Sequence, residues 1–236
     1  MTAVGIIPAR YASTRFPGKV LAPIHGYPMV HHVYQRALQC RTLDEVLIAA
    51  DSPDVADTCA ALGDRVILTR TDHVSGTDRV AEAVRDMEFD LVVNIQGDEP
   101  QLDASVVDQL VTHMQAQSDL PMGTAGSTVL SREDMANPHI VKVIGRDGMA
   151  TAFYRLLPAP VPEGVILRHI GLYAFRREFL FRFTAQPPSQ WEQENRLEQL
   201  RALEMGASIG LVKTDYVSMA VDTPEDLERI VENWSE

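Results

Sequence analysis

Residues 9–19 (A-R-Y-A-S-T-R-F-P-G-K) concentrate three cations and two small hydroxyl side chains in one short stretch. Arg10 and Arg15 carry planar guanidinium groups that match phosphate oxygens, and Lys19 adds a compact positive charge. The stretch lacks both G-x-x-x-x-G-K-S/T and G-x-G-x-x-G, which excludes a P-loop and a dinucleotide fingerprint. We expect this loop to bind phosphate groups, with a solvated basic loop as the alternative.

Two aspartates that follow apolar segments are candidate metal ligands. Asp98 comes after residues 91–95 (L-V-V-N-I), and Asp222 comes after residues 217–221. A carboxylate facing a cationic loop suits a Mg²⁺ ion that also contacts phosphate. The alternatives are structural, because Asp98 could cap a helix that begins near Asp103, and a carboxylate beside a helix N-terminus, such as Asp222, is favourable without a metal.

Residues 71–79 (T-D-H-V-S-G-T-D-R) form a third polar stretch, rich in hydrogen-bond donors and acceptors. Such a loop can contact the hydrogen-bonding edge of a nucleotide base. An ordinary turn in which Thr77 caps the following helix is the alternative.

Elements that could position these residues are visible as apolar runs that alternate with amphipathic stretches. In the first half we predict strands or helices over residues 4–8, 29–38, 46–50, 54–62, 66–68, 77–87, 90–95 and 104–115. This alternation predicts an α/β fold with a mainly parallel sheet covered by helices on both faces. Ligands of such sheets bind at the carboxyl ends of the strands, where residues 9–19, Asp51, residues 69–76 and residues 96–100 would lie.

The second half has a different pattern. Strand-like segments at residues 122–129, 140–144, 150–154 and 167–175 are not regularly separated by long helices, which predicts a mixed sheet or a small antiparallel layer. The proline-rich residues 156–164 predict a stiff connector, and residues 191–205 predict one helix that ends at Gly206. A last helix should begin with Thr223 as its N-cap, Pro224 at N1 and Asp226 at N3.

Composition and charge restrict the class of protein. The 236 residues include 21 Lys+Arg and 33 Asp+Glu, a formal net charge of −12 that would repel nucleic acid and anionic membranes. Cys40 and Cys59 have no metal-ligand spacing, and no signal-peptide pattern or apolar run of about 18 residues is present. We therefore expect a cytoplasmic protein that binds neither nucleic acid nor membrane.

In this order, the motifs resemble those of sugar-activating nucleotidyltransferases, and more closely those of the 3-deoxy-manno-octulosonate (Kdo) cytidylyltransferases, also called CMP-Kdo synthetases. The resemblance covers residues 7–19, 72–79, 94–100, 168–173 (R-H-I-G-L-Y), 197–201 (L-E-Q-L-R) and 221–226 (V-D-T-P-E-D). General nucleotidyltransferases share the first and third of these segments. The His-x-Gly-x-Tyr and L-E-Q-L-R segments indicate this family specifically.

The resemblance implies a Rossmann-like nucleotidyltransferase fold with a mixed, mostly parallel sheet, helices on both faces and a small second sheet layer. It also implies a homodimer that transfers CMP from CTP to Kdo and releases diphosphate, for lipopolysaccharide or capsule biosynthesis. Carried onto matching positions, the nucleotide site would comprise Arg10, Arg15, Lys19, Ser75, Gly76 and Gln96, with Ser75 and Gly76 reading cytosine. Mg²⁺ would be bound by Asp98 and Asp222, and the sugar-acid pocket would be shaped by Arg155, His169, Tyr173, Glu198 and Gln199.

We expect a single domain over residues 1–236. Residues 1–130 would mainly bind the nucleotide, residues 131–215 the sugar acid and the dimer partner, and residues 216–236 would supply a metal aspartate and the closing helix. The chain departs from the family at Tyr154, where a serine is expected, and in the short connector that follows. Another Kdo-like or nonulosonic acid is therefore an alternative substrate, and a non-catalytic nucleotide-sensing module is an alternative function.

Overall fold

The computed structural model describes residues 1–12, 16–217 and 219–234. The chain divides into two compact units. The first unit contains Met1–Asp108 and the segment from residue 218 to the C-terminus, and the second contains Gln109–Val217.

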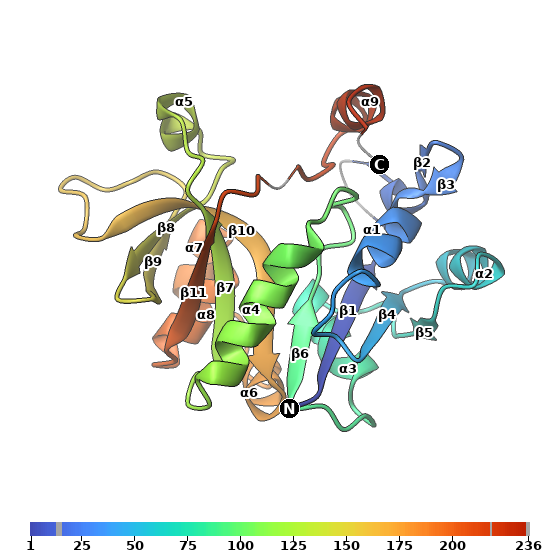
Figure 1. Cartoon of the computed structure of the whole chain (residues 1–236), viewed down its shortest axis with the longest axis horizontal. Helices are drawn as coiled ribbons and strands as arrows, with labels where there is room; N and C mark the ends of the chain where they lie inside the picture. The colour runs from blue at the N-terminus through green and yellow to red at the C-terminus, as the bar shows by residue number, and fades with distance from the viewer. Residues whose placement is uncertain (13–15, 218, 235–236) are drawn as a thin grey trace. The chain divides into compact units, whose positions relative to one another are not determined.

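Four parallel strands form the sheet of the first unit. They are β1 (Ala3–Ala9), β4 (Glu45–Ala50), β5 (Val66–Leu68) and β6 (Leu91–Asn94). Their order is β5-β4-β1-β6, and β1 pairs in parallel with both β4 and β6 (Figure 1). The first five residues of β1 and all four of β6 are buried, as expected of central strands covered on both faces.

Helices connect these strands and pack on them. They are α1 (Met29–Ala37), α2 (Pro53–Ala61) and α3 (Gly76–Ala83). Ser52 begins α2 by accepting a hydrogen bond from the backbone N–H of Val55, and Pro53 occupies the first helical turn. Between β1 and α1 lie a short 3₁₀ helix, η1 (Lys19–Leu21), and the hairpin of β2 (Pro23–Ile24) and β3 (Tyr27–Pro28).

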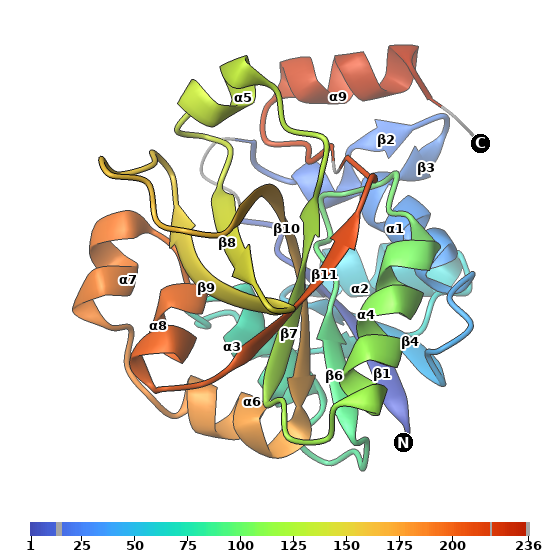
Figure 2. The same cartoon turned by 60° about the vertical axis from the view of Figure 1, so that its left-hand side comes forward.

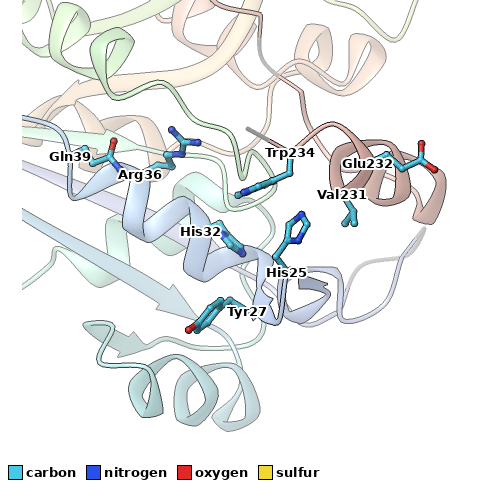
Figure 3. A pocket seen from close by; sticks show the side chains of 8 residues that line it. All are labelled: His25, Tyr27, His32, Arg36, Gln39, Val231, Glu232 and Trp234. Atoms are coloured by element: carbon cyan, nitrogen blue, oxygen red, sulfur yellow. The ribbon is translucent and has the colours of Figure 1, made fainter. Parts of the chain in front are cut away.

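The C-terminal helix α9 (Pro224–Glu232) belongs to the first unit and is anchored by apolar contacts. Ile230 packs with Ile24 and Met29 in a small buried cluster that also contains Val221. The Trp234 ring contacts His32 of α1, with ring centroids 4.6 Å apart, beside a cavity of about 930 Å³ (Figure 3). This anchoring fixes the segment that immediately precedes α9.

The second unit is a mixed sheet. Its strands are β7 (Met122–Ser127), β8 (Lys142–Arg146), β9 (Met149–Tyr154), β10 (Val165–Arg176) and β11 (Ile209–Thr214). β7 pairs in parallel with β11 and antiparallel with β10, while β8 pairs antiparallel with both β9 and β10. Because β11 also pairs with β9, the pairings return to their starting strand (Figure 2).

The helices of this unit are short. They are α5 (Arg132–Ala136), α6 (Arg177–Thr184), α7 (Gln190–Asn195) and α8 (Gln199–Glu204). α8 packs beside β9 (Figure 2). A longer helix, α4 (Ala104–Ala116), begins in the first unit and ends in the second.

The predicted fold class, an α/β fold with a large mixed sheet and helices, is confirmed. Two local predictions are wrong. The helix predicted over residues 191–205 is two helices, because Arg196 adopts a left-handed conformation (φ 53°) that ends α7. Among the described residues of 217–221 no strand forms, while β11, which we did not predict, does. None of the described helices has the length and apolar character needed to cross a membrane.

Candidate active site

A cavity of about 310 Å³ lies at the carboxyl ends of β1 and β6 in the first unit. Its lining consists of Pro8, Arg10, Ala12, Lys19, Val20, Gly76, Gln96, Gly97, Asp98 and Asp222. These residues come from segments far apart in the sequence, which the parallel sheet and the anchored C-terminal helix bring to one edge. The structure thus gathers six of the residues named from sequence, and Arg15 lies outside the described residues.

The ammonium group of Lys19 lies between two carboxylates. Its Nζ is 2.6 Å from Oδ2 of Asp98 and 3.5 Å from Oδ1 of Asp222. Nζ also donates a hydrogen bond to the carbonyl of Val221, at 2.9 Å. The Lys19 side chain is only 12% exposed, whereas those of Asp98 and Asp222 are 25% and 43% exposed. Both carboxylates therefore lie beside the same cation, and each side chain is still partly exposed, so that a ligand can contact it.

Lys19 is positioned by a tight backbone turn. Gly18 has a φ of 70° and donates its N–H to the carbonyl of Tyr11, at 2.8 Å. The N–H of Tyr11 donates in turn to Oδ1 of Asp51, at 2.9 Å, just beyond the end of β4. The loop after β1 is thereby tied to the neighbouring strand.

Asp98 is positioned by the close approach of its loop to β1. A Cβ atom at Gly97 would lie 2.8 Å from the carbonyl oxygen of Pro8, so only glycine fits there without displacement. The alternative role of Asp98 as a helix cap is wrong, because Asp103 accepts the N–H of Ser105 at the start of α4.

Asp222 is held by the start of α9. The N–H of Val221 donates to the carbonyl of Asp98 at 2.9 Å, which joins the two aspartate segments directly. Thr223 and Asp226 form the capping box expected from sequence, and Asp226 also accepts the N–H of Asp222. The helix cap and the candidate metal ligand are therefore different residues.

The polar stretch before α3 begins that helix. Ser75 is the N-cap: its Oγ accepts the N–H of Asp78, whose carboxylate accepts the N–H of Ser75. The alternative in which Thr77 caps the helix is therefore wrong. Gly76 lines the cavity, and a Cβ there would contact the ring of Pro8 at 3.4 Å.

In the second unit, the guanidinium of Arg155 donates to three backbone carbonyls. These belong to Asn195, Arg196 and Pro138, at 2.9, 3.0 and 3.2 Å. Arg155 thereby holds the left-handed turn between α7 and α8, directly before Glu198.

His169 and Tyr173 lie together on β10. Their ring centroids are 5.5 Å apart, and Nε2 of His169 is 3.0 Å from Oγ1 of Thr124. Burial lowers the pKa of His169 to about 3, so the imidazole is neutral at physiological pH. Burial, together with the nearby charge of Glu198, raises the pKa of Tyr173, which keeps its phenol protonated.

Glu198 and Gln199 begin α8 and complete this group. Arg201 Nη2 lies 3.5 Å from a carboxylate oxygen of Glu198. The amide nitrogen of Gln199 is buried and has no hydrogen-bond partner within the described part of the chain. All five residues named for the sugar acid thus lie around β9, β10 and α8, where Gln199 offers a buried, unused donor.

The place of Gly97 between a buried strand and a candidate ligand indicates close backbone approach, and the structure shows that the neighbour is Pro8 of β1. Sequence reasoning did not single out Val20 and Ala12 as walls of the cavity. The small Ala12 and apolar Val20 carry no chemical signal, because only the folded loop shows that they face the cavity.

Comparison with known proteins identifies the family. The family described as Cytidylyltransferase matches residues 4–209. The 3-deoxy-manno-octulosonate cytidylyltransferase of Syntrophotalea carbinolica is 42% identical, over 98% of this chain and 97% of its own. The enzyme of the same name from Geobacter metallireducens is also 42% identical, over 100% of this chain and 98% of its own.

A solved structure of CMP:2-keto-3-deoxy-manno-octonic acid synthetase in complex with CTP is 39% identical, with a TM-score of 0.92, and the match covers 99% of this chain and 98% of that one. The resemblance drawn from the motifs is confirmed. The chain belongs to the 3-deoxy-manno-octulosonate cytidylyltransferase family.

Proposed function

We propose that this enzyme joins CMP from CTP to Kdo and releases diphosphate. The observation that carries the proposal is the placement of Lys19 between Asp98 and Asp222 in a cavity at the sheet edge. A cation flanked by carboxylates suits a substrate that brings both phosphate charge and a metal ion. Family membership supports the cytidine nucleotide and the sugar acid.

The first unit would bind CTP. Arg10 and Lys19, with Gln96 nearby, would contact the triphosphate, and the turn at Ser75 and Gly76 would contact cytosine. The cap role of Ser75 occupies its hydroxyl and its N–H. The groups suited to the base are the N–H of Gly76 and the second lone pair of the Ser75 carbonyl, which already accepts the N–H of Arg79 at 3.4 Å. Arg15 would add a further cation to the phosphate site.

Asp98 and Asp222 fit a Mg²⁺ ion. Both carboxylates contact the same ammonium group, so they converge on one position for positive charge. Mg²⁺ is commonly held by one or two carboxylates together with substrate phosphates and water, which matches this donor set. When bound, Mg²⁺ would offset phosphate charge and lower the pKa of the attacking hydroxyl.

The chemistry needs no nucleophile from the protein. The anomeric 2-hydroxyl of the sugar acid would attack the α-phosphorus of CTP, forming the new P–O bond as the bond to diphosphate breaks. Lys19 and Arg10 would offset the charge that accumulates on the transferred and leaving groups. The protein's main contribution would be positioning of the two substrates.

The second unit would bind the sugar acid. Glu198 would accept hydrogen bonds from its hydroxyls, and the unpartnered amide of Gln199 would donate to one of its oxygens. Neutral His169 and protonated Tyr173 would shape the pocket. Arg155 would contribute by holding the turn before Glu198, since its guanidinium already donates to three carbonyls.

The wider setting belongs to the same proposal. We assign the nucleotide role mainly to residues 1–130, sugar-acid and dimer contacts to residues 131–215, and the second metal ligand to residues 216–236. A cytoplasmic homodimer that supplies lipopolysaccharide or capsule synthesis is the setting we propose. A related nonulosonic acid is the second candidate substrate, favoured by Tyr154 in place of the expected serine.

Diphosphate release tests the proposal. Purified enzyme with Mg²⁺ should release diphosphate from CTP only when Kdo is added, and UTP should be a much poorer donor. A pocket that accepts a hydrogen bond from the 4-amino group of cytosine leaves that acceptor unpaired against uracil. Equal turnover of CTP and UTP would contradict the cytosine assignment of Ser75 and Gly76, and release with another nonulosonic acid but not Kdo would correct the substrate.

A further inference from the structure

Arg79 is a buried cation of the first unit to which the proposed reaction assigns no role. It lies on α3, four residues after the N-cap Ser75, and is 0% exposed. It does not line the active-site cavity. Because its side chain is fully covered, any influence on the nucleotide must pass through the residues that it contacts.

One side of the guanidinium holds the segment that leads to the predicted base site. Nη1 donates to Oγ1 of Thr69 at 2.5 Å and to the carbonyl of Arg70 at 2.9 Å. Thr69 is in turn fixed to the end of β4, because its Oγ1 donates to the carbonyl of Ala50. We call residues 69–76 the base loop.

The other side faces Asp51, which in turn holds the segment that carries the phosphate-binding cations. Nη2 lies 3.8 Å from Oδ2 of Asp51, and Oδ1 of the same carboxylate accepts the N–H of Tyr11. The N–H of Asp51 also donates to the carbonyl of Ala9, at 3.2 Å. We call residues 10–12 and 16–19 the phosphate loop.

Burial of Arg79 and Asp51 has a high free-energy cost if the pair serves only to stabilise the fold. Nε and Nη2 of Arg79 have no hydrogen-bond partner among the described residues, and Asp51 is only 7% exposed. Burial lowers the pKa of Arg79, while the Asp51 carboxylate acts in the opposite direction. Buried ion pairs of this kind are frequently no more stabilising than apolar replacements. A role in positioning explains why a cation occupies this place.

We propose that Arg79 is a positioning residue that joins the base loop to the phosphate loop, so that cytosine recognition and triphosphate binding strengthen each other. The proposal rests on the proposed function in one respect, the identity of the nucleotide. Asp51 is its partner in this role. In physical terms the contacts of Arg79 supply a coupling free energy between the two parts of the nucleotide site.

Separate probes for the two loops measure this coupling. Titration calorimetry with Mg²⁺ would follow cytidine binding with and without inorganic tripolyphosphate. In the wild-type protein tripolyphosphate should strengthen cytidine binding by about tenfold, a usual size for coupling between sites. Arg79→Met should bring that factor close to one.

Two further variants separate coupling from folding. Asp51→Asn keeps an acceptor for the Tyr11 N–H but removes the charge that faces Arg79, so it should also lose the coupling. Arg79→Lys keeps the charge, but one nitrogen cannot reach both Thr69 and Asp51, so its coupling should be intermediate. If Arg79→Met does not fold, these two variants decide the question.

Arg176→Met is the matched control. Arg176 also donates to three backbone carbonyls, those of Met114, Gln117 and Leu120, none of which belongs to either loop. Its loss should lower the thermal unfolding midpoint and leave the coupling factor unchanged.

A coupling factor of wild-type size in a folded Arg79→Met, Arg79→Lys or Asp51→Asn variant would overturn the proposal. The absence of coupling in the wild-type protein would also overturn it. Both probes bind without the sugar acid. A protein that shows the coupling yet fails to turn over CTP with Kdo would therefore contradict the proposed function alone.

Discussion

Replacing Gly97 with alanine should damage the site that Asp98 occupies. The added Cβ would lie 2.8 Å from the carbonyl oxygen of Pro8 and 3.4 Å from Cγ2 of Ile7. Pro8 belongs to β1 and is paired in register with Ala49 of β4, so its backbone cannot easily withdraw. The loop at residues 96–98 must move instead, by about 0.6 Å, to restore ordinary van der Waals contact.

The size of the effect follows from this displacement. Overpacking against fixed backbone costs about 1–3 kcal/mol of unfolding free energy. The same shift changes the position of Asp98 relative to Lys19, whose ammonium is now 2.6 Å from Oδ2 of Asp98. Misplacement approaching 1 Å in a catalytic array lowers rates by up to about a hundredfold, so we expect kcat/KM to fall by about tenfold to a hundredfold.

Gly145→Ala is the control for crowding alone. Its Cβ would also meet an atom at 2.8 Å, but that atom is Cδ2 of Leu211, the end of a flexible side chain in the second unit. Gly145→Ala should lower the free energy of unfolding and leave kcat/KM unchanged. Urea unfolding and diphosphate release would be measured on both variants. Wild-type kcat/KM in Gly97→Ala would refute the argument that close approach to β1 positions Asp98.

Three further predictions concern single side chains. Asp98→Asn and Asp222→Asn should each lower turnover by about a hundredfold without changing the thermal unfolding midpoint, since a neutral ligand of the same shape replaces an anionic one. If Asp222→Asn loses stability but keeps turnover, that residue serves only the entry to α9. Glu198→Ala should raise KM for Kdo by about tenfold and leave the Kd of CTP unchanged, because a substrate hydroxyl loses its acceptor. A matching rise in the Kd of CTP would remove Glu198 from the sugar-acid site. Because burial lowers the pKa of His169 from 6.5 to about 3, the unfolded chain binds the extra proton between these values, and the free energy of unfolding should fall as the pH falls through this window. Urea unfolding at pH 7 and pH 5 should show a smaller loss in His169→Phe than in wild type, and equal losses would count against this assignment.

The candidate site at the ends of the strands could be predicted because each of its residues is marked by its immediate neighbours in the sequence. Lys19 and Asp98 each follow an apolar strand, and parallel strands place such positions at one edge. The capping box of Thr223 and Asp226 is likewise written in four adjacent residues and was predicted in full. Short-range patterns of this kind need no knowledge of distant contacts.

Long-range contacts explain what could not be predicted. The spacing of Leu197, Leu200 and Leu203 fits one long helix as well as two short ones. The left-handed turn at Arg196, which separates the two helices, is held by Arg155, 41 positions away in the chain. In β11, Gly210 and Lys213 interrupt the alternation of apolar and polar residues that indicates a strand. The sequence therefore gives no clear signal for this strand, which pairs with β7. Nothing in the sequence around Arg79 indicates that its partners come from the ends of two other strands.

The most direct test of the account is identification of the joined product. Wild-type enzyme, CTP, Kdo and Mg²⁺ would be followed by ³¹P NMR and mass spectrometry. One phosphodiester-linked CMP-Kdo and one diphosphate should form for each CTP consumed, and Asp98→Asn should form them about a hundredfold more slowly. Consumption of CTP to free CMP or CDP without a CMP-Kdo linkage, or product formation at the wild-type rate by Asp98→Asn, would contradict this mechanism.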